Sequence, residues 1–121
     1  MKRGDVFTVS TRGLAAKPRP GIIVQATPLI RTDHPVLVCP LSSELLPVTI
    51  IRPLLKPSIV NGLHVLSQAM VDRITGAMPR EIGTIIGTLD EDDLQSINFA
   101  LLTILGLGQV LADFSNFRDP S

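Results

Sequence analysis

The chain has 121 residues, enough for one domain with a buried core, and its 45% hydrophobic content excludes an intrinsically disordered protein. No apolar run reaches the roughly 18 to 20 residues that a membrane span needs. Asp5 also interrupts the region where a signal peptide would be apolar. We therefore expect a single domain over residues 1–121 that is cytoplasmic and not bound to a membrane.

The formal net charge is zero, but positive and negative residues are unevenly distributed. Residues 1–56 contain eight Lys or Arg and three Asp or Glu, whereas residues 57–121 contain three and eight. The two parts therefore carry net charges of +5 and −5. Such asymmetry lets a neutral protein present one surface to an anionic ligand, although ordinary solvated faces would give the same counts.

Cys39 is the only cysteine, which excludes an internal disulfide and a CxxC metal site. It ends the apolar run Val36-Leu37-Val38-Cys39, a position that favours a buried structural thiol; a catalytic thiol is the alternative. The two histidines, His34 and His64, have no neighbour at metal-ligand spacing. We therefore expect neither a metal nor another cofactor.

Short segments rich in β-forming residues, separated by turn signals, occupy most of the chain. The continuous apolar run in residues 21–25 indicates a strand buried on both faces. Ten prolines argue against a helical bundle, so the pattern favours a small barrel or sandwich. A loop is predicted at residues 11–18 and a turn at Asn61-Gly62. The predicted strands are residues 5–10, 21–25, 36–41, 48–51, 63–66 and 69–74.

The pattern becomes helical after Thr88. Thr88 and Glu91 have the spacing of a capping box, and the acidic run of residues 90–93 suits the positive end of a helix dipole. Gly106 is a plausible C-terminal stop. We therefore predict a barrel over about residues 4–87, a helix over about residues 89–106 and a loose polar tail over residues 112–121. The helix carries a broad apolar stripe at Leu94, Ile97, Leu101, Leu102, Ile104 and Leu105.

This stripe is wide for a helix that covers a small barrel. All of it could face the barrel of its own chain. Alternatively, part of it could lie in an interface between two subunits. The sequence favours neither arrangement.

Five segments carry a resemblance to a known family. Pro18-Arg19-Pro20 leads into the second strand, Cys39-Pro40-Leu41-Ser42-Ser43 ends the third, and residues 67–74 contain an acid at Asp72. With residues 3–6 and 85–89, and in this order, they resemble the MazF/PemK toxins of type II toxin–antitoxin systems. The resemblance implies a mainly β fold, an SH3-like small barrel with a C-terminal helix, and a homodimer. It also implies an endoribonuclease that cleaves single-stranded RNA, including messenger RNA, without a metal, and an acidic antitoxin as partner.

The resemblance assigns the catalytic roles to Arg19, Ser42 and Asp72. The Arg19 guanidinium can form a fork onto two phosphate oxygens, Ser42 can donate to a phosphate, and Asp72 can accept a proton or orient Arg19. Each has a structural alternative. Arg19 could form a surface ion pair, Ser42 could cap the end of a strand, and Asp72 could pair with a nearby arginine, Arg73 or Arg80. The residues expected to bind RNA are Arg12, Lys17, Pro18 and Ser43.

Other features depart from the family pattern. The loop of residues 11–17 lacks the Glu or His found there in many members, and Met70 stands where some relatives have an arginine. His34 and His64 are possible bases, but neither falls on a family catalytic position. The absence of Trp and Tyr also argues against an extended base-stacking platform.

Two other functions are therefore open at this stage. The first is a gyrase-poisoning toxin of the CcdB type, although the Arg-Pro motif and the lack of a C-terminal Trp favour the nuclease. The second is a catalytically impaired barrel that only binds antitoxin or RNA.

Overall fold

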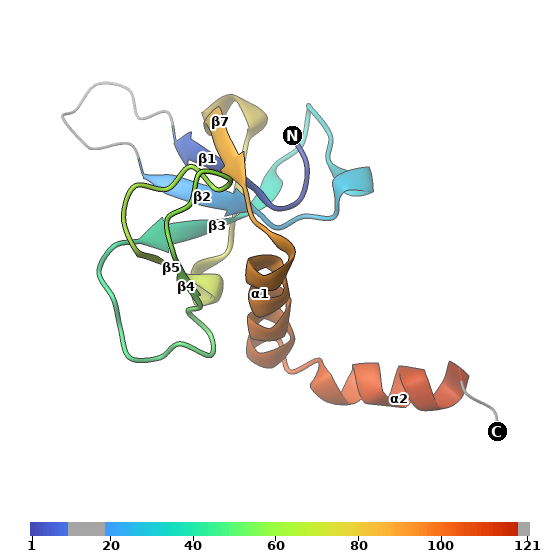
Figure 1. Ribbon diagram of the computed structural model, residues 1–121. Coiled ribbons are helices and arrows are strands. Elements are labelled where there is room, and N and C mark those ends of the chain that lie inside the picture. The colour runs from blue at the N-terminus through green and yellow to red at the C-terminus, as the bar shows by residue number, and fades with distance from the viewer. Residues whose placement is uncertain (10–18, 119–121) are drawn as a thin grey trace.

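The computed structural model describes residues 1–9 and 19–118 (Figure 1). In this part of the chain, seven strands form an antiparallel sheet of order β4-β5-β3-β2-β1-β7, and β6 also pairs with β3. The sheet curls as a half-barrel, which confirms the mainly β fold with a C-terminal helix. The strands are β1 Asp5–Val9, β2 Pro20–Ile23, β3 Val36–Ser42, β4 Leu54–Leu55, β5 Ser67–Ala69, β6 Thr75–Ala77 and β7 Ile82–Thr88. The helices are α1 Glu91–Ile104 and α2 Gly108–Arg118, with 3₁₀ turns at Thr27–Leu29, Val71–Arg73 and Pro79–Glu81.

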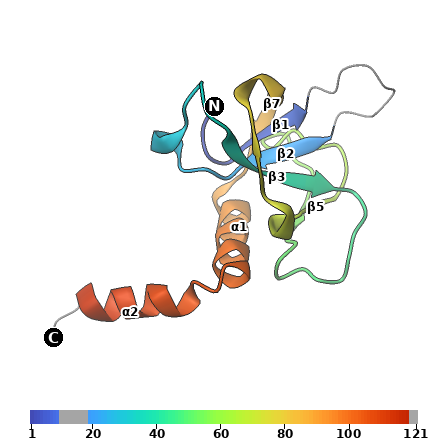
Figure 2. The same ribbon diagram turned by 180° about the vertical axis from the view of Figure 1, so that it is seen from behind.

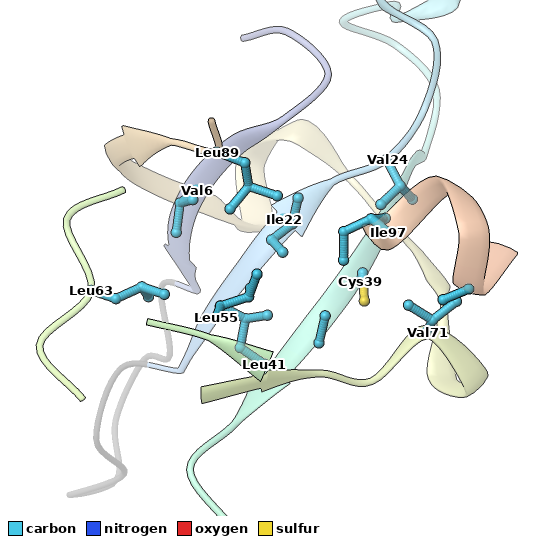
Figure 3. Close-up of a cluster of buried hydrophobic side chains, with 12 residues drawn as sticks. Val6, Ile22, Val24, Cys39, Leu41, Leu55, Leu63, Val71, Leu89 and Ile97 are labelled. Atoms are coloured by element: carbon cyan, nitrogen blue, oxygen red, sulfur yellow. The ribbon is translucent and has the colours of Figure 1, made fainter. Parts of the chain in front are cut away.

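Both faces of the sheet are packed, because neighbouring residues of a strand point to opposite sides. Ile22 joins the larger core cluster and Ile23 the smaller one, so the prediction of a strand buried on both faces is confirmed. Figure 3 shows the larger cluster, in which Ile97 of α1 meets side chains of the sheet. Cys39 lies in this cluster and is fully buried, as the sequence predicted.

The predicted strand 69–74 is wrong, and Pro40 provides the reason. Leu41 pairs with Ala69, so Pro40 faces Met70, whose amide donates to the Pro40 carbonyl at 2.9 Å. Proline has no amide to return the second bond of this antiparallel pair. The Met70 carbonyl instead accepts from the Arg73 amide at 2.8 Å. The chain therefore leaves the ladder in a 3₁₀ turn and rejoins β3 as β6.

Two further predicted strands are also wrong. Residues 48–51 form a turn in which the Arg52 amide donates to the Val48 carbonyl, while Leu54 and Leu55 take the place beside β5. Residues 63–66 form a loop whose first amide donates to the Asn61 side chain instead of a neighbouring strand. In both segments β-forming residues remain outside the sheet, so tertiary context overrides propensity.

Helix α1 has clear caps, which differ in part from the prediction. The N-cap is Asp90, whose carboxylate accepts from the Asp93 amide at 2.8 Å; the predicted capping box from Thr88 is therefore wrong. Thr88 instead donates to the Gly4 carbonyl. At the other end Gly106 adopts φ +68°, and the amides of Gly106 and Leu107 donate to the carbonyls of Thr103 and Leu102. This is a Schellman motif, which confirms Gly106 as the stop.

The apolar stripe of α1 divides between core and solvent. Ile97 is fully buried and Leu94 and Leu101 pack on the core, whereas Ile104 and Leu105 are exposed. The stripe therefore does not face the barrel over its whole width. The predicted loose tail is also wrong for its described part, because α2 continues to Arg118 and projects away from the sheet in both views (Figures 1 and 2). Neither helix is long and apolar enough to cross a membrane.

Two glycines allow the loop of residues 58–66 to lie directly against β7. A Cβ at Gly62, which has φ +70°, would collide with the Ile86 carbonyl, and one at Gly87 would collide with the carbonyls of Val60 and Asn61. The Thr88 amide also donates to the Val60 carbonyl at 2.9 Å. The loop is therefore held on β7 by backbone contacts that no larger residue permits.

This contact predicts that alanine substitutions at two glycines with positive φ lower the free energy of unfolding by different amounts. Gly62→Ala should lower the free energy of unfolding by at least about 2 kcal/mol, because strain adds to a collision with backbone. Gly106→Ala should cost about 1 kcal/mol, the steric cost of a left-handed residue, because a Cβ there meets nothing within 4 Å. Urea denaturation of both variants checks this. Equal losses would show that the β7 contact adds no constraint.

Candidate active site

A groove of about 730 Å³ is lined by residues from several strands of the sheet. Its walls come from strands β1, β2, β3 and β7 and from the loop that Gly62 and Gly87 hold against β7. It brings together the predicted residues Arg19, Ser42 and Ser43. The lining residues are Thr8, Arg19, Pro20, Leu41, Ser42, Ser43, Glu44, Gly62, Leu63, His64, Val65, Ser67 and Ile86.

Arg19 is positioned by the start of β2. Its carbonyl accepts from the Val9 amide at 2.9 Å, and Pro20 is in register with Thr8 of β1. The proline ring also restricts the backbone of Arg19 to extended conformations. The residue is exposed at the groove, so its permanent positive charge is available to an anionic ligand.

Ser42 lies at the end of β3 and has a structural contact of its own. Its hydroxyl oxygen accepts from the Glu44 amide at 3.1 Å, and the hydroxyl donates to the Glu44 carbonyl at 3.4 Å. This contact shapes the turn that places Ser43 and Glu44 on the groove wall. In the structure the hydroxyl proton is used within this turn, so donation to a phosphate would require the phosphate to replace the Glu44 carbonyl as acceptor.

Asp72 is not among the residues that line the groove. Its carboxylate forms a bidentate pair with Arg52, at 2.9 and 3.0 Å, in place of the expected Arg73 or Arg80. The pair is partly sheltered, with 11% of the Arg52 side chain and 29% of the Asp72 side chain exposed. The hydrogen bonds from Arg52 lower the pKa of Asp72. The pair joins the turn after β5 to the segment before β4.

Cys39 is unsuited to nucleophilic chemistry. Burial, with a smaller effect of the Asp72 charge, raises the pKa of its thiol to about 12. The thiolate is the nucleophilic form of cysteine, so this thiol is inert at neutral pH.

The structure adds groove residues that the sequence did not assign. His64 and Glu44 both line the groove and are exposed, whereas His34 lies beside Asp33 outside it. The local signal for His64 was the Asn61-Gly62 turn just before it. That turn does not reveal the contact with β7, which is distant in sequence.

Three of the predicted RNA-binding residues, Arg12, Lys17 and Pro18, lie outside the described residues. Within residues 1–9 and 19–118, no group of three or more His, Cys, Asp or Glu side chains is placed to hold a metal ion. The chemistry that the described groove offers is therefore that of one fixed cation, hydroxyl donors, a carboxylate and an imidazole.

Comparison with known proteins identifies the family. Residues 2–105 match the family described as PemK-like, MazF-like toxin of type II toxin–antitoxin system. The chain belongs to this toxin family. It is also 32% identical over 108 residues to a probable endoribonuclease MazF from Mycolicibacterium smegmatis. The aligned region covers 88% of this chain and 98% of that protein.

Solved structures share the fold of this chain. An endoribonuclease from a mycobacterial species, in complex with its cognate antitoxin, superposes with a TM-score of 0.73 at 24% identity and covers 88% of this chain and 96% of its own. A second mycobacterial endoribonuclease gives 0.72 at 23% identity, with coverages of 89% and 93%. The family match ends at residue 105, before the start of α2.

The Asp72–Arg52 pair predicts a pH-dependent contribution to stability. Because the pKa of Asp72 is lowered by folding, the stabilisation is present above the ordinary carboxyl pKa of about 3.9 and is lost as the pH falls through the lower folded value. Asp72→Asn should therefore lower the melting temperature at pH 7, and the difference from wild type should shrink at pH about 3.

Asp33→Asn is the matched control. Asp33 forms a similar pair with Arg31, but these side chains are 60% and 64% exposed, so its loss should change the melting temperature little. Thermal melts of both variants at the two pH values check this. Equal effects of the two substitutions at pH 7 would contradict the structural role of the sheltered pair.

Proposed function

We propose that this chain is a toxin endoribonuclease that cleaves single-stranded RNA, including messenger RNA, without a metal ion. The observation that carries the proposal is the convergence of Arg19, Ser42 and Ser43 in one groove of a chain that belongs to a toxin family. The relative named as a probable endoribonuclease, similar over nearly its whole length, supports the same activity. Because messenger RNA is a cytoplasmic substrate, we also propose that the protein acts in the cytoplasm.

The reaction uses the RNA itself as nucleophile. The 2′-oxygen loses its proton and forms a bond to the adjacent phosphorus, while the bond from phosphorus to the 5′-oxygen breaks and that oxygen gains a proton. Negative charge develops on the phosphate in the transition state. A preorganised donor aimed at this charge is the protein's largest contribution.

Arg19 is suited to that role because its planar guanidinium can donate two parallel hydrogen bonds to phosphate oxygens. Ser42 and Ser43, on the neighbouring wall, supply hydroxyl donors for the same phosphate or the next one. We give Asp72 a structural role, since Arg52 occupies both of its carboxylate oxygens. Arg12, Lys17 and Pro18 keep their predicted role as RNA contacts before Arg19.

We also propose that the toxin is a homodimer. Phe99 and Ile104 of α1 are exposed, as are Leu105, Leu107, Val110 and Leu111 that follow, and exposed large apolar side chains in this number favour an interface. Light scattering at micromolar concentration should give twice the chain mass of 13.0 kDa. A monomeric mass at that concentration would contradict the proposal.

The proposed protein partner is an antitoxin with an acidic segment. Arg19 at the groove offers the complementary charge, and a protein of the same fold has been solved with its cognate antitoxin. The acidic segment would cover the groove and exclude RNA. Competition between an acidic peptide and RNA for the groove, lost in Arg19→Glu, is the expected result; competition that is unaffected by Arg19→Glu counts against it.

The role of Arg19 predicts that a lysine cannot replace it. Lysine keeps the charge but cannot form the planar bidentate contact, so Arg19→Lys should be nearly as damaging as Arg19→Ala. In single-turnover cleavage at saturating RNA, both should be slower by roughly 10²- to 10³-fold, with little change in RNA affinity. Thermal melts should show both variants folded, because Arg19 is exposed. Cleavage by folded Arg19→Ala within a few-fold of wild type would remove Arg19 from the mechanism.

A further inference from the structure

We propose that His64 is the general base of the cleavage reaction, the group that accepts the proton of the attacking 2′-hydroxyl. This inference rests on the proposed endoribonuclease function and assigns the proton transfer that Arg19 and Ser42 cannot perform. Arginine stays protonated, and a serine hydroxyl is a poor proton acceptor at neutral pH. Another group of the described groove must therefore accept the proton of the 2′-hydroxyl.

The titratable side chains that line the described groove are Arg19, Glu44 and His64. Arg19 is excluded as a base, which leaves a carboxylate and an imidazole. Histidine is the side chain that exchanges protons near neutral pH, where a general base is most effective. Asp72, the base expected from the sequence, is held by Arg52 and does not line the groove.

The backbone at His64 is held firmly, as a catalytic group requires. Asn61 is buried, and its side chain accepts from the amides of Ser58 and Leu63 at 3.0 and 2.9 Å and donates to the Lys56 carbonyl at 2.8 Å. Gly62 then contacts β7. These contacts fix the loop on both sides of the turn that precedes His64.

The imidazole itself is available for chemistry. His64 is exposed at the groove, and within residues 1–9 and 19–118 neither ring nitrogen forms a hydrogen bond or ion pair. Arg19 enters the groove from β2 and His64 from the loop against β7, so the two side chains belong to different walls. A phosphate held by Arg19 would therefore lie in the same groove that His64 lines.

The proposed step balances in atoms and electrons. A neutral His64 ring nitrogen takes the proton of the 2′-hydroxyl, and the freed electron pair forms the bond from the 2′-oxygen to phosphorus. The bond from phosphorus to the 5′-oxygen breaks, and that oxygen takes a proton from solvent water. The products are a 2′,3′-cyclic phosphate and a 5′-hydroxyl, and the protonated imidazole returns its proton to solvent.

The test compares His64→Gln and His64→Ala with His34→Gln, which changes the other histidine outside the groove. Single-turnover cleavage at saturating RNA is measured from pH 5 to 8.5. Wild type and His34→Gln should cleave faster as the pH rises and the base loses its proton. His64→Gln should be slower by about 10²- to 10⁴-fold and lose this acid limb, with RNA affinity within a few-fold of wild type. Added imidazole should restore part of the activity of His64→Ala, a rescue that a merely structural residue would not show.

The outcomes separate this inference from the function on which it rests. If wild type does not cleave RNA, the proposed function fails. If wild type cleaves, Arg19→Ala does not, and folded His64→Gln retains the rate and the acid limb, only the role of His64 is overturned. Loss of the acid limb in Glu44→Gln instead of His64→Gln would also overturn it and assign the base to Glu44.

Discussion

The close contact between the Asn61-Gly62 turn and β7 is the constraint on which the groove depends. Gly62 lies against the Ile86 carbonyl and Gly87 against the carbonyls of Val60 and Asn61, and neither position has room for a Cβ. Because the loop lies directly on the strand, Leu63 reaches the core while His64 and Val65 reach the groove. This close backbone contact therefore positions the loop that forms one wall of the candidate site. The opposite wall needs only regular strands, with Arg19 at the start of β2 and Ser42 at the end of β3.

Pro40 has a second effect on the same region. Because it lacks an amide, the chain after β5 turns away from β3, and the turn carries Asp72 outward to Arg52. The Asp72–Arg52 pair then fastens this turn to the segment that leads into β4. The acid that resembles a catalytic residue in sequence is thus engaged in holding two connections together. In our proposal the proton of the 2′-hydroxyl is instead accepted by His64, which comes from the loop before β5.

Much of the architecture could be predicted from the sequence. The turn-rich, proline-rich pattern indicated a small β fold, and the acidic run before an apolar stripe located α1 within two residues at each end. The failures among the strands have a common cause. Residues 48–51 and 63–66 have strand composition, but pairing depends on which strand edges are free, and only the folded chain determines that. Helix α2 was missed for a different reason, because residues 112–118 are polar enough to suggest a loose tail.

The family resemblance named Arg19, Ser42 and Ser43, and the structure brings these three residues to one groove. Asp72 was assigned from a motif that does not show its partner, since Arg52 lies 20 residues earlier. His64 was weighed only as an isolated histidine, because its place in the groove depends on the contact of Gly62 with β7.

The central claim is that this groove cleaves RNA by attack of the 2′-hydroxyl, without a metal. The most direct measurement incubates the purified chain with mixed-sequence RNA in excess EDTA and identifies the fragment ends. The account predicts cleavage in the chelator that yields 2′,3′-cyclic phosphate and 5′-hydroxyl ends. Cleavage that EDTA abolishes and magnesium restores, or fragments with 5′-phosphate ends, would contradict it.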